Sequence, residues 1–582
     1  MRHTKIVCTI GPASESDAVL ERLIQAGMNV ARLNFSHGTH DEHRRRLDAV
    51  RRVAARLGRN IGVLMDLKGP KIRIGDLAEP LELRAGERIA LTTADVPGGP
   101  GQIPVNYAAL PREVQPGNTI LLADGLIGLT VIEVQGTDIV CRVENGGLLT
   151  SRKGLNLPGV RTGLNVLTEK DIADLRFAIP LGVDFVGVSF VRRAQDILCV
   201  RRVLEDMRAA AQIIAKIETW EAVENLDEII KVADGVMVAR GDLGLEIAAE
   251  EVPLVQKRII AQCNRLGKPV ITATQMLESM IHNPRPTRAE ASDVANAILD
   301  GTDAVMLSAE TAVGEYPVEA VETMARIARR VEADLPYAAL LAKRKETLQR
   351  TVTEAISYAT CTTAADLGAA AIITATQTGY TARMVARYRP PCPIVAATPD
   401  QQVLRQLALV WGAQAVLVER IQDTDGMIAG SIQAALKAGL IKGGDLVVIT
   451  AGVPVGVHGT TNLLKVHTVG NVLARGTGVG AKAVTGTVRI VHSAREAEEK
   501  IRPGDILVAS ATDRDFVPAI QRAAAVVTEE GGLTSHAAIV GLQFGMPVIV
   551  GVEAATSILP DGETVTIDGE RGLIYSGVAR VL

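Results

Sequence analysis

Short apolar runs alternate with longer amphipathic stretches over most of the N-terminal half of this chain. Such runs are typical of buried parallel strands, and apolar residues at helical spacing, as in Asp17–Ala26 and Glu251–Leu266, indicate amphipathic helices. The strand-like runs number eight: Lys5–Ile10, Met28–Leu33, Gly62–Leu67, Val183–Ser189, Ala211–Lys216, Gly235–Ala239, Pro269–Ala273 and Asp303–Ser308. Eight strands that alternate with helices predict an α/β fold, a (β/α)8 TIM barrel, whose active site lies at the carboxyl ends of the strands.

A long segment with a different pattern interrupts this alternation after the third strand. Its runs alternate like half-buried strands, and Pro/Gly turns separate them. These runs are Leu81–Thr92, Thr119–Leu122, Leu129–Val134 and Ile139–Val143. We therefore predict an inserted small β-barrel lid domain at 69–164, with the barrel at 1–68 and 165–340. Pro70 and Pro158 lie near the two necks of the insertion, so a hinged lid is expected.

Two further domains are predicted after the barrel. The β/α alternation begins again near Thr351, and Ala371–Ala375, Ile394–Ala397 and Leu446–Thr450 are strand-like. This pattern predicts a separate open α/β domain at 341–473. The remainder, 474–582, is rich in glycine and valine and predicts a fourth, mixed β/α domain.

Composition restricts the class of protein. The chain has 582 residues, too many for one hydrophobic core, with 47% hydrophobic residues and a net charge of −4. No basic tract indicates a nucleic-acid partner, and aromatic residues make up only 3%. No apolar run approaches the ~20 residues that span a bilayer, and the first eleven residues lack the apolar core of a signal peptide. The six cysteines are scattered without a CxxC pair, which favours a reducing compartment, so we expect a cytoplasmic enzyme.

Three charged residues follow two neighbouring predicted strands. Lys216 and Glu218 are two residues apart, so on an extended chain their side chains point to the same side, and Asp242 follows the next strand. An ammonium and two carboxylates can hold a hard cation and stabilise an anion beside it. The alternative is a structural ion pair that caps the two strands. Because three charges converge where this fold has its active site, we favour a functional site.

Several sequence motifs follow one another along the chain. They are KIVCTIGPAS (Lys5–Ser14), RLNFSHG (Arg32–Gly38), DLKGPKIR (Asp66–Arg73), KGLNLP (Lys153–Pro158), KIE (Lys216–Glu218), MVARGDLG (Met237–Gly244) and TATQMLESM (Thr272–Met280). Together these motifs resemble the pyruvate kinase family over the barrel, the insertion and the α/β domain. The resemblance implies phosphoryl transfer from phosphoenolpyruvate to ADP, the last step of glycolysis. It also implies a homotetramer and a regulatory domain.

The resemblance assigns roles to the charged residues at the strand ends. Glu218 and Asp242 match the family's ligands for Mg²⁺ or Mn²⁺, and Lys216 matches the residue that supports the transferring phosphoryl group and the enolate oxygen. In phosphoryl transfer, positioning and charge neutralisation carry most of the catalysis.

Three further positions match the family's substrate contacts. Arg32 has the planar fork to grip the substrate phosphate, with a strand-end ion pair as its alternative role. Thr274 and the backbone N–H groups of Gly241 and Asp242 are expected to hold the substrate carboxylate. Thr274 also matches the position linked to enolate protonation, with strand packing as the alternative.

Nucleotide and K⁺ contacts follow from the same resemblance. Arg73 and Lys153 match nucleotide-phosphate contacts, with solvated surface roles as the alternative, and His37 either approaches the nucleotide or is a structural histidine. The residues that match the K⁺ site are Asn34, Ser36, Asp66 and Leu67. Many K⁺-dependent members carry Glu where this chain has Lys71, whose ammonium can supply the charge that K⁺ would supply. We therefore predict weak or absent K⁺ dependence.

A hydroxyl-rich strand-to-helix turn lies in the α/β domain. Hydroxyl and N–H groups in such a turn can hold a phosphate, and in the family this loop binds phosphorylated effectors. The expected effector contacts are Thr374, Thr376, Thr378, Gly379 and Thr381. Helix capping is the alternative role for these threonines. AMP or a sugar phosphate is the expected effector.

The C-terminal segment carries a second resemblance. Glu530–Ile539 (EGGLTSHAAI) is similar to the swivelling phosphohistidine domain of phosphoenolpyruvate-utilising enzymes, in which the residue matching His536 carries a phosphoryl group. The chain has no recognisable ATP-grasp domain to complete that cycle. We therefore interpret this domain as a packing or regulatory module.

Two other functions compete with the kinase. A metal-dependent barrel aldolase also stabilises a pyruvate enolate, but it needs neither the lid residues nor the K⁺ residues. An inactive, phosphoenolpyruvate-sensing protein would be supported by the loss of Lys216, Glu218 or Asp242, and all three are present.

Overall fold

The described residues form two compact units. The computed structural model describes residues 2–345, 351–421, 423–454, 461–470, 472–480 and 482–579. The first unit consists of Met1–Thr347, Ala382–Arg389 and Asp400–Ala415, and the second of Leu348–Thr381, Pro390–Pro399 and Val416–Leu582. Across the described ranges, each helix is too short or too polar to cross a bilayer.

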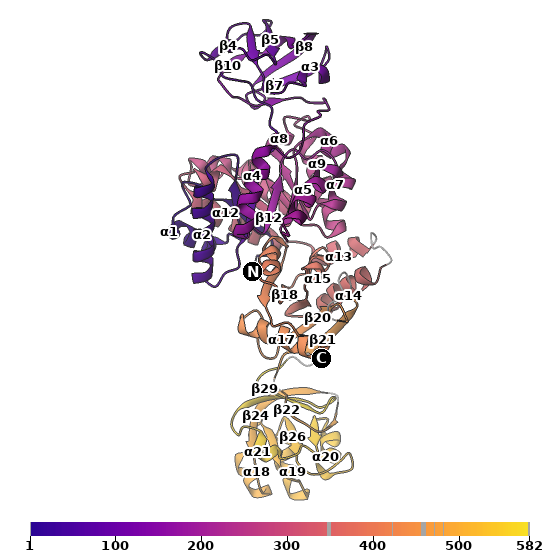
Figure 1. The fold of residues 1–582 in the computed structure, drawn as a ribbon. Helices are drawn as coiled ribbons and strands as arrows, with labels where there is room; N and C mark the ends of the chain where they lie inside the picture. Colours follow the sequence, from indigo (N-terminus) through magenta and orange to yellow (C-terminus); the bar gives the residue numbers. More distant parts are fainter. Residues whose placement is uncertain are drawn as a thin grey trace. The chain divides into compact units, whose positions relative to one another are not determined.

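A closed barrel of parallel strands forms the centre of the first unit (Figure 1). Around the barrel the strands are ordered β1, β16, β15, β14, β13, β12, β3 and β2. Their bounds are β1 (Lys5–Thr9), β2 (Val30–Asn34), β3 (Gly62–Asp66), β12 (Phe185–Val188), β13 (Gln212–Ile217), β14 (Gly235–Ala239), β15 (Val270–Ala273) and β16 (Ala304–Leu307). Each overlaps a strand predicted from the sequence, so the TIM barrel prediction is confirmed.

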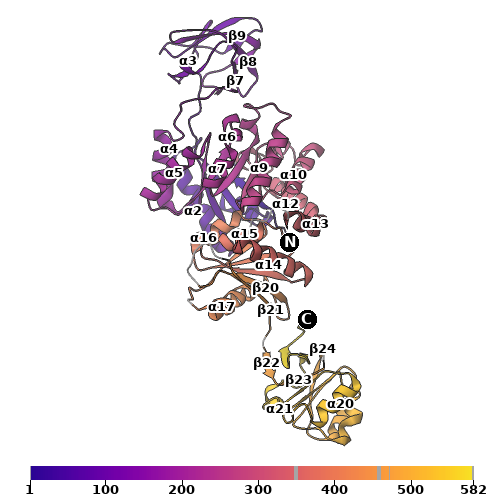
Figure 2. The same cartoon turned by 90° about the vertical axis from the view of Figure 1, so that its right-hand side faces the viewer.

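Helices surround the barrel (Figures 1 and 2). They are α1 (Asp17–Ala26), α2 (His40–Arg56), α4 (Glu169–Ala178), α5 (Ala194–Asp206), α7 (Leu226–Val232), α9 (Val252–Leu266), α10 (Arg288–Asp300) and α12 (Pro317–Ala333). Thr39, Thr168 and Thr287 each form a capping box with the acidic residue three positions later, so local sequence sets where α2, α4 and α10 begin. Helix-facing strand residues and the helices share the main core.

A second core fills the inside of the barrel. Inward-facing residues such as Val30, Leu64 and Ile214 meet there, and Ala408 and Leu409 from the short helix η3 (Leu407–Leu409) join them. This packing explains why Asp400–Ala415 groups with the barrel although it lies far along the chain.

The inserted segment is a β domain with its own core. Its strands are β4 (Leu81–Leu83), β5 (Arg88–Thr92), β6 (Gln102–Pro104), β7 (Thr119–Leu122), β8 (Ile127–Gln135), β9 (Asp138–Asn145), β10 (Gly147–Leu149) and β11 (Leu155–Asn156). They form one sheet in the order β11-β7-β8-β9-β5-β6 and a small sheet of β10 and β4. The predicted run Leu81–Thr92 is two strands, because the chain turns at Gly86, whose φ of +87° suits glycine.

The second unit contains an α/β sheet and a larger mixed sheet. The α/β sheet is ordered β19-β18-β17-β20-β21. Its strands are β17 (Ala371–Ala375), β18 (Ile394–Thr398), β19 (Ala413–Leu417), β20 (Leu446–Ala451) and β21 (Leu463–Thr468), and its long helices are α14 (Val352–Asp366) and α17 (Thr424–Lys437). Of these strands, β20 and β21 are antiparallel, and β17 is parallel to both β18 and β20.

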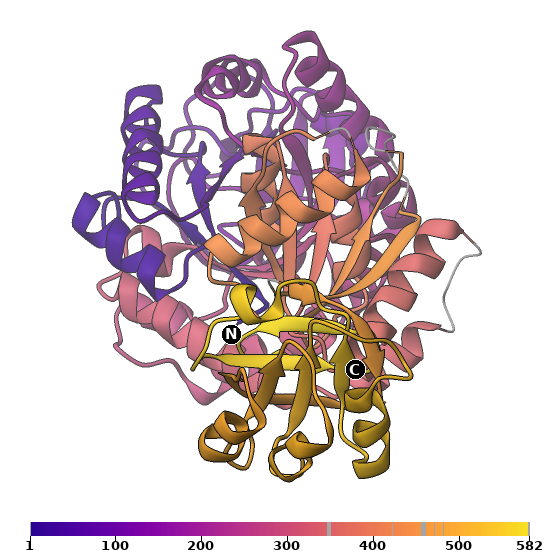
Figure 3. The same cartoon turned by 90° about the horizontal axis from the view of Figure 1, so that it is seen from below.

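The C-terminal domain is a mixed sheet in the order β22-β29-β28-β24-β25-β26-β27-β23. The strands are β22 (Val472–Arg475), β23 (Thr477–Val479), β24 (Ala483–Ile490), β25 (Ile506–Ala509), β26 (Ala525–Thr528), β27 (Val548–Val550), β28 (Thr564–Asp568) and β29 (Leu573–Ser576). Helices α18 (Ala494–Lys500), α19 (Val517–Ile520) and α20 (His536–Phe544) pack in one core, and α21 (Ala555–Ile558) packs in another (Figure 3). A mixed β/α domain is therefore present, as predicted.

Candidate active site

A buried cluster of charges lies at the carboxyl ends of β3, β12 and β13. The Lys216 ammonium lies 2.8 Å from Glu218 Oε1 and 3.2 Å from Asp66 Oδ1, and it donates a 2.7 Å hydrogen bond to Ser189 Oγ. Lys216 is 8% exposed, and Glu218 and Asp66 are each 1% exposed. The structure therefore brings Lys216 and Glu218 together as the sequence predicted, and it adds Asp66 to the same cluster.

The charges in this cluster set one another's pKa values. Burial alone would lower the pKa of Lys216, but the carboxylates of Asp66 and Glu218 outweigh burial, and its pKa is raised. Burial raises the pKa of Glu218 to about 7; Lys216 opposes this shift and Asp242 adds to it. Burial also acts to raise the pKa of Asp66, but Lys216 and Arg32 hold it below its usual value. A permanent positive charge therefore faces the end of the barrel.

The second predicted metal ligand is more open. Asp242 lies in the short helix α8 (Arg240–Leu243) after β14, with its side chain 32% exposed and 3.4 Å from Lys71 Nζ. The other carboxylate, Glu218, accepts a 2.7 Å hydrogen bond from the Phe190 N–H. Within the described ranges no three His, Cys, Asp or Glu side chains form a metal cluster. Mg²⁺ is usually held by one or two carboxylates, with substrate and water oxygens completing its shell, so the donor set of Glu218 and Asp242 fits this ion.

Arg32 forms a strand-end ion pair, which was the alternative role that the sequence allowed for it. Its Nε donates to Asp66 Oδ2 at 2.7 Å, a terminal nitrogen lies 2.6 Å from the same oxygen, and the other terminal nitrogen donates to Thr9 Oγ1 at 2.9 Å. A guanidinium has five N–H donors, so two remain after these contacts. The ion pair therefore fixes Arg32 at the barrel end and still leaves donors for an anion.

Thr274 and Gly241 contact each other directly. The Gly241 N–H donates to Thr274 Oγ1 at 2.9 Å, and Thr274 Oγ1 donates to the Ala273 carbonyl at 2.6 Å. The N–H group of Gly241 that was expected to hold a carboxylate is thus bonded to the threonine hydroxyl. Thr274 and Gln275 both have positive φ, +66° and +54°, which is uncommon for residues other than glycine and costs conformational energy.

Arg240 holds this strained turn, a role that sequence analysis missed. Its guanidinium donates to the carbonyls of Thr274 (2.6 Å) and Ala273 (3.3 Å), and to Asp293 Oδ1 at 2.7 Å. The Arg240 side chain is 10% exposed. Its position inside the MVARGDLG motif was visible, but its acceptors are backbone atoms, which no side-chain pattern reveals. Ser189, which bonds Lys216, was missed for a similar reason, since it simply ends a predicted strand.

The nucleotide candidates lie on or near the lid. Arg73 donates to the Arg152 carbonyl at 3.0 Å and pairs with Gly154, so it joins the two necks of the lid. Lys153 is exposed beside it. His37 is exposed on the turn after β2, and its carbonyl contacts His43 Nε2 at 2.9 Å.

The predicted K⁺ residues come from the ends of β2 and β3, which are neighbours in the barrel. Asn34 Oδ1 accepts from the Ser36 N–H at 3.1 Å, and the Leu67 carbonyl accepts from Ser189 Oγ at 2.7 Å. The fourth residue, Asp66, is engaged by Arg32 and Lys216.

Comparison with known proteins identifies the family. Residues 1–321 match the pyruvate kinase barrel domain and residues 354–467 match the pyruvate kinase alpha/beta domain. The chain is 55% identical to a pyruvate kinase of Geobacillus stearothermophilus and 53% identical to one of Bacillus licheniformis, in each case over the whole of both chains. The chain belongs to the pyruvate kinase family. A crystal structure of pyruvate kinase from Cryptosporidium parvum, 40% identical, covers 80% of this chain and 96% of its own, with a TM-score of 0.77.

The C-terminal domain also has relatives. Residues 501–572 match the mobile domain of PEP-utilising enzymes, and the full-length matches show that the Geobacillus and Bacillus pyruvate kinases extend over this region too. His536 lies at the start of α20, and its Nδ1 is 3.1 Å from Thr512 Oγ1.

The expected effector loop of this pyruvate kinase joins β17 to α15 (Tyr380–Ala386). Thr374 is fully buried, and its hydroxyl has no hydrogen-bond partner among the described residues. Thr381 Oγ1 lies 3.1 Å from Thr461 Oγ1, and Gly379 has a φ of +74°. Thr376 is buried and Thr378 lies between Thr376 and Gly379 in the turn.

Proposed function

We propose that Lys216, Glu218 and Asp242 carry the phosphoryl transfer of this pyruvate kinase, from phosphoenolpyruvate to ADP. The observation that carries the proposal is the buried ammonium, 2.8 Å from Glu218, at the carboxyl end of the barrel. As phosphoryl is lost, negative charge grows on the enolate oxygen, and a preorganised ammonium stabilises it without reorganisation. Removing one such group typically costs about 10²–10³ in rate.

Glu218 and Asp242 would hold Mg²⁺ or Mn²⁺, and pyruvate kinases generally use Mg²⁺ and K⁺. When bound, the divalent ion would neutralise negative charge on the substrate oxygens. The chain's own contribution is to hold the two carboxylates from neighbouring strand ends, one fixed by the Phe190 N–H and one facing Lys71.

Arg32 is proposed to bind the substrate phosphate with its remaining donors. Thr274 and the N–H groups of Gly241 and Asp242 are proposed to hold the substrate carboxylate, and Thr274 to hold the proton that reaches the enolate. The Gly241–Thr274 hydrogen bond keeps the two groups side by side, and a substrate carboxylate would replace Thr274 Oγ1 as the acceptor of the Gly241 N–H.

Arg73, Lys153 and His37 are proposed to contact the nucleotide phosphates. Arg73 pairs with Gly154, and the Ile74 N–H donates to the Lys153 carbonyl at 3.0 Å, so the segments that carry both cations lie side by side at the lid necks. The boundaries 1–68 with 165–340, 69–164, 341–473 and 474–582 are proposed for the barrel, lid, regulatory and C-terminal domains.

We further propose that K⁺ dependence is weak, although Asn34, Ser36, Asp66 and Leu67 are retained. The support is the Lys71 ammonium, which lies 3.4 Å from Asp242 and provides a fixed positive charge in the site. Titration of KCl at constant ionic strength, against a tetramethylammonium control, should change the rate little. Strong activation by K⁺ alone would contradict this proposal.

A phosphorylated effector, AMP or a sugar phosphate, is proposed to bind the loop of Thr374, Thr376, Thr378, Gly379 and Thr381. The Thr374 hydroxyl supports this, because it has no partner in the described part of the chain and a buried hydroxyl without a partner is costly. The homotetramer and the cytoplasmic location are proposed from the family, and the C-terminal domain with His536 is proposed to be a packing or regulatory module.

One assay tests the catalytic proposal. Pyruvate is measured after mixing the chain with phosphoenolpyruvate, with and without ADP and with and without Mg²⁺. Pyruvate should form only when both are present. Pyruvate released without ADP would instead indicate hydrolysis, and the absence of pyruvate in every mixture would favour the inactive sensor.

A further inference from the structure

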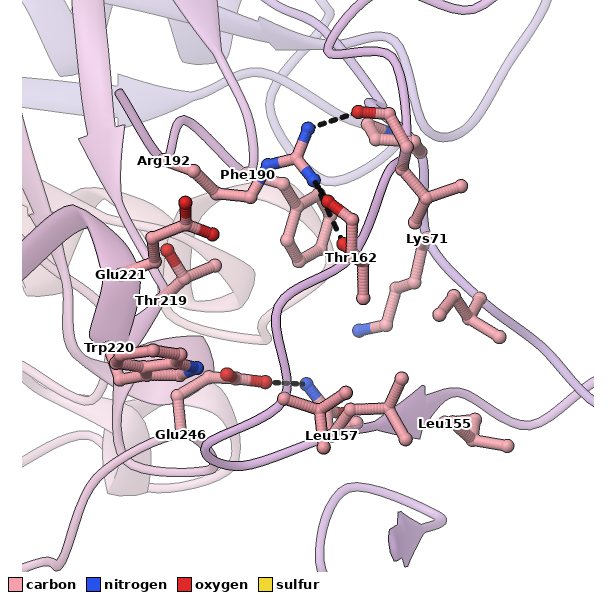
Figure 4. Close-up of a pocket in the computed structure, with 15 residues that line it drawn as sticks. Lys71, Leu155, Leu157, Thr162, Phe190, Arg192, Thr219, Trp220, Glu221 and Glu246 are labelled. Atoms are coloured by element: carbon pink, nitrogen blue, oxygen red, sulfur yellow. Dashed lines mark hydrogen bonds between the residues drawn. The ribbon is translucent and has the colours of Figure 1, made fainter. Parts of the chain in front are cut away.

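A pocket lies where the lid necks meet the top of the barrel (Figure 4). Lys71, Leu157 and Thr162 line it from the necks, and Phe190, Trp220 and Glu246 line it from the barrel side. None of the residues proposed above for the substrate, the nucleotide or the effector lines it, but Lys71, which is proposed above to supply the charge of K⁺, does. A mostly apolar cavity with a few polar groups is the usual form of a small-molecule site.

The polar groups of this pocket favour a cation. The carboxylates of Glu246 and Glu221 and the hydroxyl of Thr219 face it, and Figure 4 shows the Glu246 carboxylate beside the Trp220 ring. The guanidinium of Arg192 is occupied by the carbonyls of Thr162 and Leu164. The other cation that lines the pocket, Lys71, lies 3.4 Å from Asp242, so among the described residues neither cation of the pocket is paired with Glu246 or Glu221.

Two observations strengthen this reading of the pocket's charge. Glu246 accepts a hydrogen bond from Asn156 Nδ2 at 3.2 Å and another from the backbone of Leu157, and a carboxylate with about four lone-pair sites can still accept from an ammonium. The Trp220 ring has a cation partner in this chain, the guanidinium of Arg161 at 5.6 Å from its centroid, so the charge of an added ammonium would be bound chiefly by Glu246. An ammonium placed beside both groups would gain an ion pair and a contact with an aromatic ring.

The pocket is joined to the active site by short contacts. The N–H of Phe190 donates to Glu218 at 2.7 Å, and Lys71 Nζ lies 3.4 Å from Asp242. Phe190 has a φ of +55°, a strained conformation held by its surroundings. An occupant that presses on both Phe190 and the neck residue Leu157 therefore acts on both proposed metal ligands and on the lid.

We propose that this pocket is a regulatory site for a small organic cation with an apolar body, of the class of primary arylalkyl amines. The ammonium pairs with Glu246, and the apolar body lies against Trp220 and Leu157. Its regulatory effect rests on the roles proposed for Glu218 and Asp242, whereas binding itself does not. Burial raises the pKa of Glu246, and a bound ammonium favours its ionised form.

Binding is tested on the full chain with 2-phenylethylammonium chloride, without substrate or metal. Tryptophan fluorescence is the readout, because the chain has two tryptophans and Trp220→Phe shows which signal comes from the pocket. A saturable change is expected that is lost in Trp220→Phe. Glu246→Gln should weaken binding about 30-fold or more, since it removes one partner of a desolvated charge pair. Glu250→Gln, at an exposed position four residues on, is the matched control and should leave binding unchanged.

The neutral analogue 2-phenylethanol separates charge from shape. It should bind far more weakly than the ammonium. No saturable signal with the ammonium, or equal binding by Glu246→Gln, overturns the site. The amine should also change the KM for phosphoenolpyruvate in the wild type but not in Glu246→Gln. Binding that leaves kcat and KM unchanged overturns the regulatory part of the proposal. This outcome is distinguishable from failure of the catalytic proposal, because pyruvate formation without the amine is measured in the same assay.

Discussion

Replacement of Arg240 by methionine removes the guanidinium that holds the turn at Thr274. Arg240 donates to the carbonyls of Thr274 at 2.6 Å and Ala273 at 3.3 Å, and it is anchored by Asp293 at 2.7 Å. Methionine keeps most of the apolar length of the side chain but no donor. The two carbonyls then lose their shared partner in a region where Arg240 is only 10% exposed.

The size of the effect follows from two costs. A hydrogen bond to a charged group contributes roughly 1.5–3 kcal/mol, so loss of the stronger bond to Thr274 removes about that much support. The positive φ values of Thr274 and Gln275 store about 1–3 kcal/mol of conformational strain each, so the turn should relax when the hydrogen bonds from Arg240 are lost. A relaxation that moves Thr274 Oγ1 by about 1 Å costs on the order of 10² in rate. We therefore expect kcat/KM for phosphoenolpyruvate to fall about 10²-fold or more.

The assay compares wild type, Arg240→Met, Arg240→Lys and Asp293→Asn by steady-state kinetics, with thermal unfolding to verify folding. Lysine keeps the charge but not the planar fork, so it should recover only part of the activity. Asp293→Asn should lose less than Arg240→Met, because the arginine and its carbonyl bonds remain. A folded Arg240→Met chain within about threefold of the wild-type kcat/KM would refute the reasoning.

Three further predictions follow from the buried groups. Lys216→Met should abolish pyruvate formation and also lower thermal stability, because the two buried carboxylates beside it lose their cation, a loss of about 3–5 kcal/mol; unchanged melting would contradict this. Burial lowers the pKa of His3 to about 4, so between that pH and about 6.5 the unfolded chain binds more protons than the folded chain. The free energy of unfolding of the wild type should therefore fall as the pH drops through this window, and that of His3→Gln should fall less. Equal falls in the two proteins would be evidence against this role of His3. Gly69→Ala should reduce kcat strongly, because φ is +68° and the new Cβ would lie 2.9 Å from Ser189 Cβ, whereas Gly58→Ala, with φ +60° and no atom within 4 Å, should leave kcat unchanged.

The barrel was predictable because each strand is a continuous buried run and the helix starts carry their own caps. The break in Leu81–Thr92 was not, since both halves are apolar and the turn depends on one glycine with positive φ. The sequence of Asp400–Ala415 does not indicate that this segment packs against the barrel either, because the contact joins residues far apart along the chain. Local pattern therefore predicts elements better than their grouping.

The candidate site was predictable to the level of side chains that carry charge. The contact of Lys216 with Glu218 follows from their spacing along a strand. Spacing does not predict the bond between the Gly241 N–H and Thr274, nor the role of Arg240. Both depend on the backbone of a turn, and the residue types in that turn do not indicate its positive φ values. For Arg32 the residue type allowed two roles, and only the folded structure shows that the ion pair with Asp66 leaves two N–H donors free.

The central claim is that Glu218 and Asp242 hold one divalent cation with the Lys216 ammonium beside it. Crystals of the full chain with Mn²⁺ and phosphoenolpyruvate, measured at the manganese absorption edge, test it directly. The anomalous difference map should show one strong peak between the two carboxylates, with the substrate phosphoryl group next to Lys216. A peak elsewhere on the barrel, or substrate bound away from Lys216, would contradict the account.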